Sequence, residues 1–358
     1  MANVSFNNVK ITAISTVVPP TVKYIDDEID LYGGNESQIK RIKKSIGLDS
    51  RHVIGNDDVT TLDLCLSATE NLFKLHHVDR ESIDGLVFVT QTPDHFQPTN
   101  AAIVHGKLEL SIDAACFDVS LGCSGYVYGL WLSHMMIQSG TCKNVLVLAG
   151  DTLSRCVNPR DRSAAPLFGD AGSATLVQRT DAPQKSYFSL HTDGSGFENI
   201  IQPAGAFRTP SNEQTKIVEV DGDGNSRSLE DLHMNGSEVF NFSIKREPEA
   251  IKQILEYSDF TIDEVDYVFF HQANQYIISN IVRRLKMPKE KAPSDIVGKY
   301  GNQSSASIPC AISYTLSKDE QKVEKPVILS GFGVGLSWAS AIVDISGTVV
   351  TDVNIYQK

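Results

Sequence analysis

Two stretches of this chain, about 180 residues apart, repeat the same order of features. VDRESIDGLVFVTQTP (Val78–Pro93) and DFTIDEVDYVFFHQAN (Asp259–Asn274) each run from a short acidic link through Ile-Asp to an apolar strand that ends in polar residues. About 32 residues beyond each strand end, the chain reaches a glycine, then Cys123 in one copy and Asn302 in the other, then an apolar helix. Each copy closes with an apolar strand and a run of small residues. Three features repeated in the same order predict two similar halves packed against each other.

The duplication also predicts the domain organisation. We expect an N-terminal half over residues 1–180 and a C-terminal half over residues 181–358. The segments Val145–Gly150 and Val327–Gly333 are short, apolar and ended by glycine, which is typical of buried strands. Because strand-like and helix-like segments alternate throughout, the fold class is expected to be α/β, with layers of helices on largely buried sheets.

Composition and charge exclude several classes of protein. The chain has 358 residues and a formal net charge of -12, whereas a nucleic-acid-binding protein needs a basic surface. No apolar run approaches the length of a transmembrane helix. The N-terminal sequence MANVSFNNVKITAIS lacks the basic and apolar segments of a secretory signal. We therefore expect a cytoplasmic protein that binds neither nucleic acid nor membranes.

No pattern in the sequence indicates a metal site. The six cysteines include no C-x-x-C pair, and no cysteine–histidine cluster has zinc-finger spacing, so free thiols are expected. Within the polar stretch Pro210–Glu230, the segment DGDGNS (Asp221–Ser226) resembles the start of a calcium loop. Ser226 and Leu232 stand where that loop requires Gly and Glu, so a hairpin turn is favoured.

Cys123 lies in FDVSLGCSGYVYGLWLS, where a strand-like run breaks into a turn before an apolar helix. Most free cysteines are small buried hydrophobic residues, and Cys123 alone fits that description. A cysteine at a helix N-terminus can instead be a nucleophile, because the helix dipole and free N–H groups favour the thiolate.

His271 and Asn302 also have ordinary interpretations when each is taken alone. A histidine just after a buried strand is usually a structural residue, and an asparagine between a glycine and a helix start is usually a turn or N-cap residue. The duplication, however, places both at strand ends that correspond to that of Cys123. A site in which Cys123 accepts an acyl group, while His271 and Asn302 donate hydrogen bonds, fits all three.

Nearly the whole chain, from about Val9 to Ile345, resembles β-ketoacyl-acyl-carrier-protein synthase III of the thiolase superfamily. The resemblance rests on FDVSLGCSGYVYGL, DRSAAPLFGDAGSA, MNGSEVF, HQANQYIIS, YGNQSSASIPCA and GFGVGLSWASA, in this order. It implies a thiolase-like five-layered αβαβα fold built from two duplicated halves, and a homodimer.

The resemblance also implies a mechanism. Cys123 would take an acyl group from a thioester, and the backbone N–H groups of Cys123 and Val334 would form the oxyanion hole. A malonyl thioester on an acyl-carrier protein would then lose CO2, and His271 and Asn302 would stabilise the enolate that attacks the acyl-enzyme. This chemistry needs no metal or other cofactor, since the acyl-coenzyme A or acyl-carrier thioester is a substrate. By the same resemblance, the substrate-binding residues are Arg162, Gly236, Asn274, Phe332 and Gln97.

The segment RRLKMPKEK carries five basic residues and one acidic residue. Carrier proteins are acidic, so Arg283, Arg284 and Lys286 are candidates for docking one electrostatically. The alternative is a solvated helix end, where cations are favourable in any case.

Several positions depart from the pattern of housekeeping family members. Arg41 and Ser45 stand where a Trp and an Arg hold the adenine of coenzyme A, and Tyr276 replaces an arginine after the His-Gln-Ala-Asn motif. Ser124 follows the nucleophile in place of alanine, and Gln97 stands at or near the usual Phe gate of the acyl pocket. These departures predict weaker binding of coenzyme A and an acyl substrate that is functionalised or larger. They favour a specialised member, from a secondary-metabolite or surface-polymer pathway, over a fatty-acid starter enzyme.

Other functions compete with this interpretation. An acyltransferase of the same fold would pass the acyl group to an oxygen, nitrogen or sulfur nucleophile, which needs only a general base. A nicotinamide dehydrogenase is excluded, because GFGVGLSW has the spacing G-x-G-x-G and leads into a strand. Gly122–Gly125 likewise lacks the second spacer of a serine hydrolase motif. A degenerate synthase kept as a dimer partner is disfavoured by the intact set of Cys123, His271 and Asn302.

Overall fold

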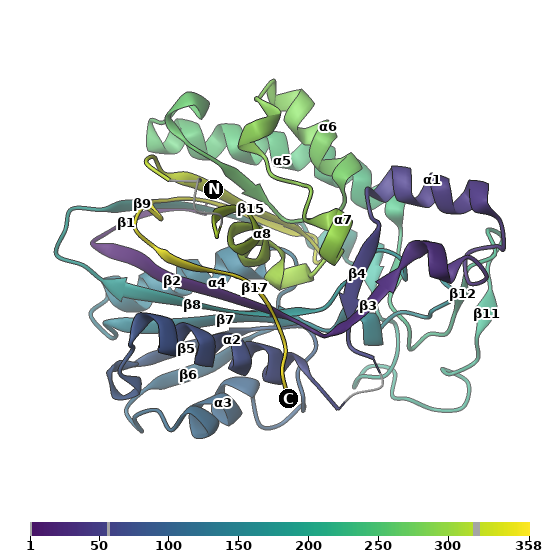
Figure 1. Cartoon of the computed structure of the whole chain (residues 1–358), viewed down its shortest axis with the longest axis horizontal. Helices are drawn as coiled ribbons and strands as arrows, with labels where there is room; N and C mark the ends of the chain where they lie inside the picture. The colour runs from purple at the N-terminus through teal and green to yellow at the C-terminus, as the bar shows by residue number, and fades with distance from the viewer. Residues whose placement is uncertain (1, 56–57, 318–322) are drawn as a thin grey trace.

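The computed structural model describes residues 2–55, 58–317 and 323–358. Two β-sheets alternate with three layers of helices (Figure 1). The six-stranded sheet contains, in order, β17 (Val349–Ile355), β2 (Val9–Val18), β8 (Ala171–Arg179), β7 (Asn144–Asp151), β5 (Gly85–Val89) and β6 (Ala115–Val119). The five-stranded sheet contains β1 (Ala2–Asn7), β9 (Lys185–Thr192), β16 (Ser337–Val343), β15 (Val327–Gly333) and β14 (Val268–Phe270). This five-layered arrangement confirms the predicted fold class.

The two sheets repeat one topology. β5 pairs in parallel with β7, and β14 pairs in parallel with β15. The next neighbours, β8 and β16, are antiparallel to β7 and β15, and β2 and β9 continue the order antiparallel to β8 and β16. β6 extends the first sheet and has no counterpart among the described strands of the second. The duplication predicted from the sequence is therefore confirmed for the four corresponding strands of each sheet.

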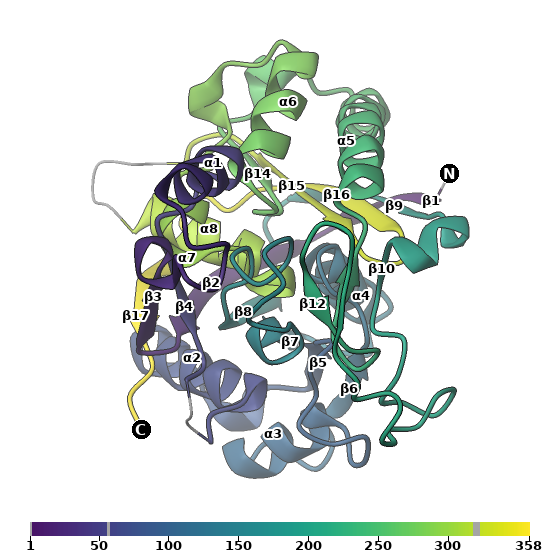
Figure 2. The same ribbon diagram turned by 90° about the vertical axis from the view of Figure 1, so that its right-hand side faces the viewer.

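Helices cover both faces of each sheet. α4 (Gly125–Gln138) and α8 (Ser307–Leu316) lie between the sheets, α2 (Thr61–His76) and α3 (Asn100–Leu108) lie outside the first, and α5 (Gly236–Ser258) and α6 (Gln275–Leu285) lie outside the second (Figures 1 and 2). Because α4 and α8 each lie between the two sheets, both helices are apolar on nearly every side. The outer helices bury one face in separate hydrophobic clusters and expose the other.

Shorter elements connect these layers. The remaining helices are α1 (Glu36–Ile46) and α7 (Val297–Tyr300), with 3-10 turns at Ile25–Glu28, Arg80–Ser82, Leu153–Arg155, Gly194–Asn199, Ile262–Glu264, Lys289–Lys291 and Ser304–Ala306. Three two-stranded ribbons pair β3 (Thr21–Tyr24) with β4 (Ser50–Val53), β10 (Ile200–Ile201) with β13 (His233–Met234), and β11 (Glu219–Val220) with β12 (Ser226–Arg227).

The terminal strands cross between the halves. β1 pairs with β9 in the second sheet, and β17 pairs with β2 in the first. The expected boundary at residue 180 falls between the end of β8 and the start of β9. We propose residue 180 as the boundary between the two halves. The sheet of each half has one edge strand that comes from the opposite terminus of the chain.

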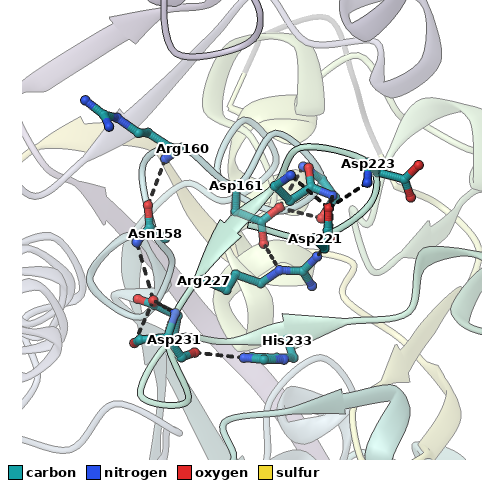
Figure 3. A network of polar contacts seen from close by, with 11 residues as sticks. Asn158, Arg160, Asp161, Asp221, Asp223, Arg227, Asp231 and His233 are labelled. Carbon is teal, nitrogen blue, oxygen red and sulfur yellow. Dashed lines mark hydrogen bonds and ion pairs between the residues drawn. The ribbon is translucent and has the colours of Figure 1, made fainter. Parts of the chain in front are cut away.

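The polar stretch Pro210–Glu230 contains the predicted hairpin, since β11 and β12 pair with Val220 opposite Ser226. Figure 3 shows how this hairpin is held against the segment that follows β7. Arg227 forms ion pairs with Asp221, within the hairpin, and with the buried Asp161, whose Oδ2 lies 3.2 Å from Arg227 Nε. The Asp221 carboxylate also accepts the backbone N–H of Asn225 at 2.9 Å. The Asp221 carboxylate is thus engaged in closing a turn.

Two negative observations concern the described part of the chain. None of its helices is both long enough and apolar enough to span a membrane. Within the same residues, no group of three or more His, Cys, Asp or Glu side chains is arranged to hold a metal ion.

Glu247 is a fully buried carboxyl between α5 and the second sheet. Its Oε2 accepts the hydroxyl hydrogen of Ser330 at 2.6 Å, and its Oε1 has no hydrogen-bond partner among the described residues. Burial raises the pKa of Glu247 to about 8 and outweighs the opposing effect of the Ser330 hydrogen bond. The folded protein therefore keeps a proton here that the unfolded chain releases above its ordinary pKa of 4.5.

We expect Glu247→Gln to remove a pH dependence of stability. Between pH 4.5 and 8 the folded state binds one proton more than the unfolded state, so the wild-type free energy of unfolding falls as the pH rises and levels off above pH 8. The loss is at most about 5 kcal/mol, at about 1.4 kcal/mol per pH unit between pH 4.5 and 8. Urea unfolding at pH 5 and pH 8 measures it. Glu249→Gln, an exposed change on the same helix, is the control, and parallel pH dependence in wild type and Glu247→Gln would contradict the assignment.

Candidate active site

A cavity of about 340 Å³ lies between the two halves, at the ends of the strands that the duplication relates. Seven of the site residues predicted from the sequence line it: Cys123, Gly236, His271, Asn274, Asn302, Phe332 and Val334. Their neighbours in the cavity wall are mostly apolar, including Leu153, Ile200, Leu232 and Val239. A thiol, an imidazole and a carboxamide thus face one apolar cavity, as expected.

Cys123 lies in the turn between β6 and α4, two residues before the first residue of the helix. The turn packs closely on the end of β15, where a β-carbon on Gly333 would lie 2.6 Å from Cys123 Sγ. Glycine is required there because the strand and the sulfur approach too closely for any side chain.

Burial raises the pKa of the Cys123 thiol to about 11. The backbone of Val334, the backbone of Cys123 and the Ser304 side chain oppose this rise, and the charge of Asp151 adds to it. The backbone N–H groups at the helix N-terminus do favour the thiolate, as expected, but desolvation outweighs them and the net pKa is raised.

His271 follows β14 directly, and its ring is buried against the edge of the Phe332 ring, with centroids 5.5 Å apart. Its Nδ1 lies 2.6 Å from the Ser307 hydroxyl oxygen, which also accepts the backbone N–H of Gln272 at 3.3 Å. Burial lowers the pKa of His271 to about 3, and the backbone of Ser304 opposes this only in part. The imidazole is therefore neutral at physiological pH and suited to donate one hydrogen bond without carrying a charge.

Asn302 lies in the turn between α7 and the 3-10 turn Ser304–Ala306. Its backbone N–H donates to Leu167 at 2.9 Å, and its carbonyl accepts from Gly169 at 3.0 Å, which fixes the turn against the first half. Its side-chain Oδ1 accepts the N–H of Ser304 at 2.9 Å. The predicted role of a turn residue is thus present, and it leaves the amide NH₂ group as the remaining donor of Asn302.

A buried carboxylate, Asp151 at the end of β7, ties the two halves together beside the cavity. It accepts the backbone N–H of Gln91 at 2.7 Å and, from the other half, the N–H and the hydroxyl of Ser305 at 3.1 and 2.7 Å. The two bonds from Ser305 span the interface between the halves and hold the turn that carries Asn302.

The structure does not bring the other predicted residues into this cavity. Gln97 is exposed and lines a second cavity of about 690 Å³, which adjoins the first through the shared residues Gln91 and Cys156. Arg162 lines a separate groove with Arg41 and Ser45 of α1. Their roles in substrate binding stay predictions.

The three docking candidates lie at the C-terminal end of α6 and are exposed. Arg283 and Arg284 are in the last turn, and Lys286 is the C-cap residue. Arg283 donates to the side chain of Asn280 at 2.6 Å. Both interpretations of this basic cluster, carrier docking and favourable placement at a helix end, are compatible with these positions.

The sequence analysis did not single out three polar residues beside the nucleophile and the histidine: Gln91, Ser304 and Ser307. Ser304 and Ser307 lie within the motif YGNQSSASIPCA, so the motif pointed to the segment without indicating which serine faces which group. Gln91 follows β5, and a β-carbon on Gly122 would lie 2.1 Å from its Oε1. Only the tertiary structure reveals these contacts.

Comparison with known proteins gives a consistent result. Residues 117–196 match the family model described as 3-Oxoacyl-[acyl-carrier-protein (ACP)] synthase III, and residues 255–345 match the model of its C-terminal part. A provisionally named 3-oxoacyl-[acyl-carrier-protein] synthase 3 of Campylobacter jejuni is 37% identical over 356 residues, covering 99% of this chain and 98% of that protein. A β-ketoacyl-[acyl-carrier-protein] synthase III of Acaryochloris marina is 35% identical over 302 residues, covering 84% of this chain and 87% of that protein.

Among solved structures, a 3-oxoacyl-(acyl-carrier protein) synthase from Burkholderia xenovorans superposes with a TM-score of 0.90 at 32% identity. The superposition covers 99% of each chain. The similarity therefore includes both halves and the terminal strands.

Proposed function

This chain belongs to the 3-oxoacyl-[acyl-carrier-protein] synthase III family, and we propose that it catalyses a decarboxylating Claisen condensation. An acyl thioester loads Cys123, and malonyl-acyl-carrier protein then supplies the carbon nucleophile, which gives a β-ketoacyl thioester and CO2. The observation that carries the proposal is the single apolar cavity that joins Cys123 to the donors His271 and Asn302. A site for acyl transfer alone would need only the thiol and a base.

In the first half-reaction, the Cys123 sulfur attacks the thioester carbonyl, and the thiol of the donor carrier leaves. The N–H groups of Cys123 and Val334 are our proposed oxyanion hole. In support, the backbone at both residues lies close enough to Cys123 Sγ to lower the pKa of the thiol. Donors fixed in the backbone cost no reorganisation as negative charge develops on the carbonyl oxygen.

In the second half-reaction, the malonyl carboxylate leaves as CO2, and the electron pair remains as an enolate on the thioester. His271 and Asn302 donate hydrogen bonds to the enolate oxygen. The Asn302 Oδ1 bond to Ser304 N–H leaves the NH₂ group for this task. The Ser307 hydroxyl, 2.6 Å from Nδ1, can donate its hydrogen there, and the neutral ring then carries its own proton on Nε2, the nitrogen that faces the substrate in this proposal. The enolate carbon attacks the acyl group and expels the Cys123 thiolate.

We also propose the acyl donor, the oligomeric state and location of the enzyme, and the residues that contact substrate. The donor is an acyl-coenzyme A or an acyl-carrier thioester, no further cofactor takes part, and the enzyme acts as a homodimer in the cytoplasm. Arg162, Gly236, Asn274, Phe332 and Gln97 are proposed to contact substrate. Arg41, Ser45 and Tyr276 support a specialised member of the family, because none of them supplies the coenzyme A contacts of the housekeeping pattern.

Intact-mass spectrometry tests the proposed reaction directly. The purified protein is mixed with a panel of acyl-coenzyme A and acyl-carrier thioesters, and malonyl-carrier is added second. We expect a mass gain of one acyl group, followed by its discharge with release of CO2 when malonyl-carrier is added. Loading that malonyl-carrier does not discharge would overturn the condensation and favour transfer to an oxygen, nitrogen or sulfur nucleophile.

Carrier docking on α6 gives a separate prediction. We expect the double variant Arg283→Glu and Arg284→Glu to raise KM for malonyl-carrier roughly tenfold or more at low salt, because both side chains are exposed cations. KM for a small malonyl-pantetheine thioester should not change. A double variant of the exposed Lys107 and Lys143, with the same change in net charge, is the control. Equal effects of the two double variants would show that only overall charge matters.

A further inference from the structure

Ser304 is an unusual residue of the cavity that contains Cys123, His271 and Asn302. It is 1% exposed, and its backbone has φ of 49°, in the left-handed region that serine rarely occupies. Non-glycine residues held in this conformation cluster at functional sites, where the surrounding structure enforces them. Here the enforcing contacts are the bond from Ser304 N–H to Asn302 and the two bonds from Ser305 to Asp151.

The Ser304 hydroxyl differs from those of the neighbouring serines. Ser305 Oγ donates to Asp151 at 2.7 Å, and Ser307 Oγ lies 2.6 Å from His271 Nδ1. The Ser304 hydroxyl, by contrast, is buried and has no hydrogen-bond partner in the described part of the chain. Because an unpaired buried hydroxyl is costly, its position requires an explanation.

Two anionic or potentially anionic groups lie within its reach. No hydrogen bond of normal geometry joins the Ser304 hydroxyl to either group, but Ser304 and Cys123 line the same cavity, and the Ser304 side chain is close enough to lower the pKa of both the Cys123 thiol and the Asp151 carboxyl. Cys123 must carry negative charge twice in the proposed reaction: when it attacks the donor thioester and when the condensation expels it. Burial raises the pKa of this thiol to about 11, so the charged sulfur requires further stabilisation.

We propose that the Ser304 hydroxyl is a further catalytic group, which donates its hydrogen to the Cys123 sulfur whenever that sulfur is a thiolate. A hydroxyl can rotate about its Cβ–Oγ bond, so its hydrogen can face Asp151 beside the neutral thiol and turn to the sulfur as the charge forms. Backbone N–H groups cannot turn in this way. The inference rests on the proposed function only in taking Cys123 as the nucleophile.

The test is the pH profile of Cys123 alkylation by iodoacetamide, which needs no substrate. Ser304→Gly removes the hydroxyl and suits the left-handed backbone, and Ser304→Ala is a second variant without the hydroxyl. A hydrogen bond to a charged group of usual strength predicts that the midpoint rises by about one to two pH units and that the rate at pH 8 falls roughly tenfold to a hundredfold. The nearby ionisable side chains Asp151, His271 and Cys156 are unchanged in both variants.

Ser124→Ala is the matched control. Ser124 is adjacent to the nucleophile, but its hydroxyl bonds to Ser337 Oγ at 2.7 Å and does not line the cavity. A higher midpoint in both Ser304 variants, with no shift in Ser124→Ala, would support the proposal. An unchanged or lower midpoint in the Ser304 variants would overturn it, and so would equal shifts in all three variants, which would indicate a general disturbance of the turn. None of these outcomes depends on whether condensation occurs.

Discussion

Cys123→Ala is expected to abolish acyl loading and to lower the rate of condensation at least about 10⁴-fold, because the covalent intermediate cannot form. Decarboxylation of malonyl-carrier, however, should persist. His271 and Asn302, the donors to the enolate, remain in the cavity with their bonds to Ser307 and Ser304. Loading is measured by intact mass, and decarboxylation by release of CO2 without an acyl donor.

Cys156→Ala provides the matched control for this experiment. Cys156 is the other thiol in the described wall of the same cavity, and burial raises its pKa to about 11 as well. It has no place in the proposed reaction, so Cys156→Ala should still acquire one acyl group. If Cys123→Ala loads and Cys156→Ala does not, the nucleophile has been assigned to the wrong sulfur.

Asn302→Asp is expected to produce the reverse pattern. The aspartate keeps an oxygen to accept the Ser304 N–H, which holds the turn, and replaces the NH₂ donor with a second oxygen. With no hydrogen bond to the enolate, and with a negative charge beside it, decarboxylation should fall about 10²- to 10³-fold. Acyl loading on Cys123 should continue, since that step does not use the Asn302 amide.

The same substitution at Asn235 controls for folding and charge. Asn235 is the N-cap residue of α5, accepts the N–H of Glu238 at 3.3 Å, and does not line the cavity. Asn235→Asp preserves this cap and should leave both half-reactions close to wild type. Equal loss of loading and decarboxylation in Asn302→Asp would indicate a damaged fold, and normal decarboxylation would remove Asn302 from the proposed mechanism.

The sequence by itself determined the duplicated α/β halves, and it identified Cys123, His271 and Asn302 as the residues most suited to one site. Strand and helix periodicity depends on local spacing, and an internal repeat is visible without any knowledge of packing. For the same reason the hairpin at Asp221–Ser226 could be predicted from its turn residues.

The tertiary structure decided what depends on neighbours distant in the chain. Gln97 and Arg162 lie outside the cavity of Cys123, and Ser307 lies against His271 from 36 residues away. The pKa of Cys123 is raised because burial outweighs the donors near the helix start, a balance that no local pattern reveals. The left-handed turn at Ser304 likewise depends on Asp151 of the opposite half, because hydrogen bonds and desolvation are set by whichever groups the packing brings together.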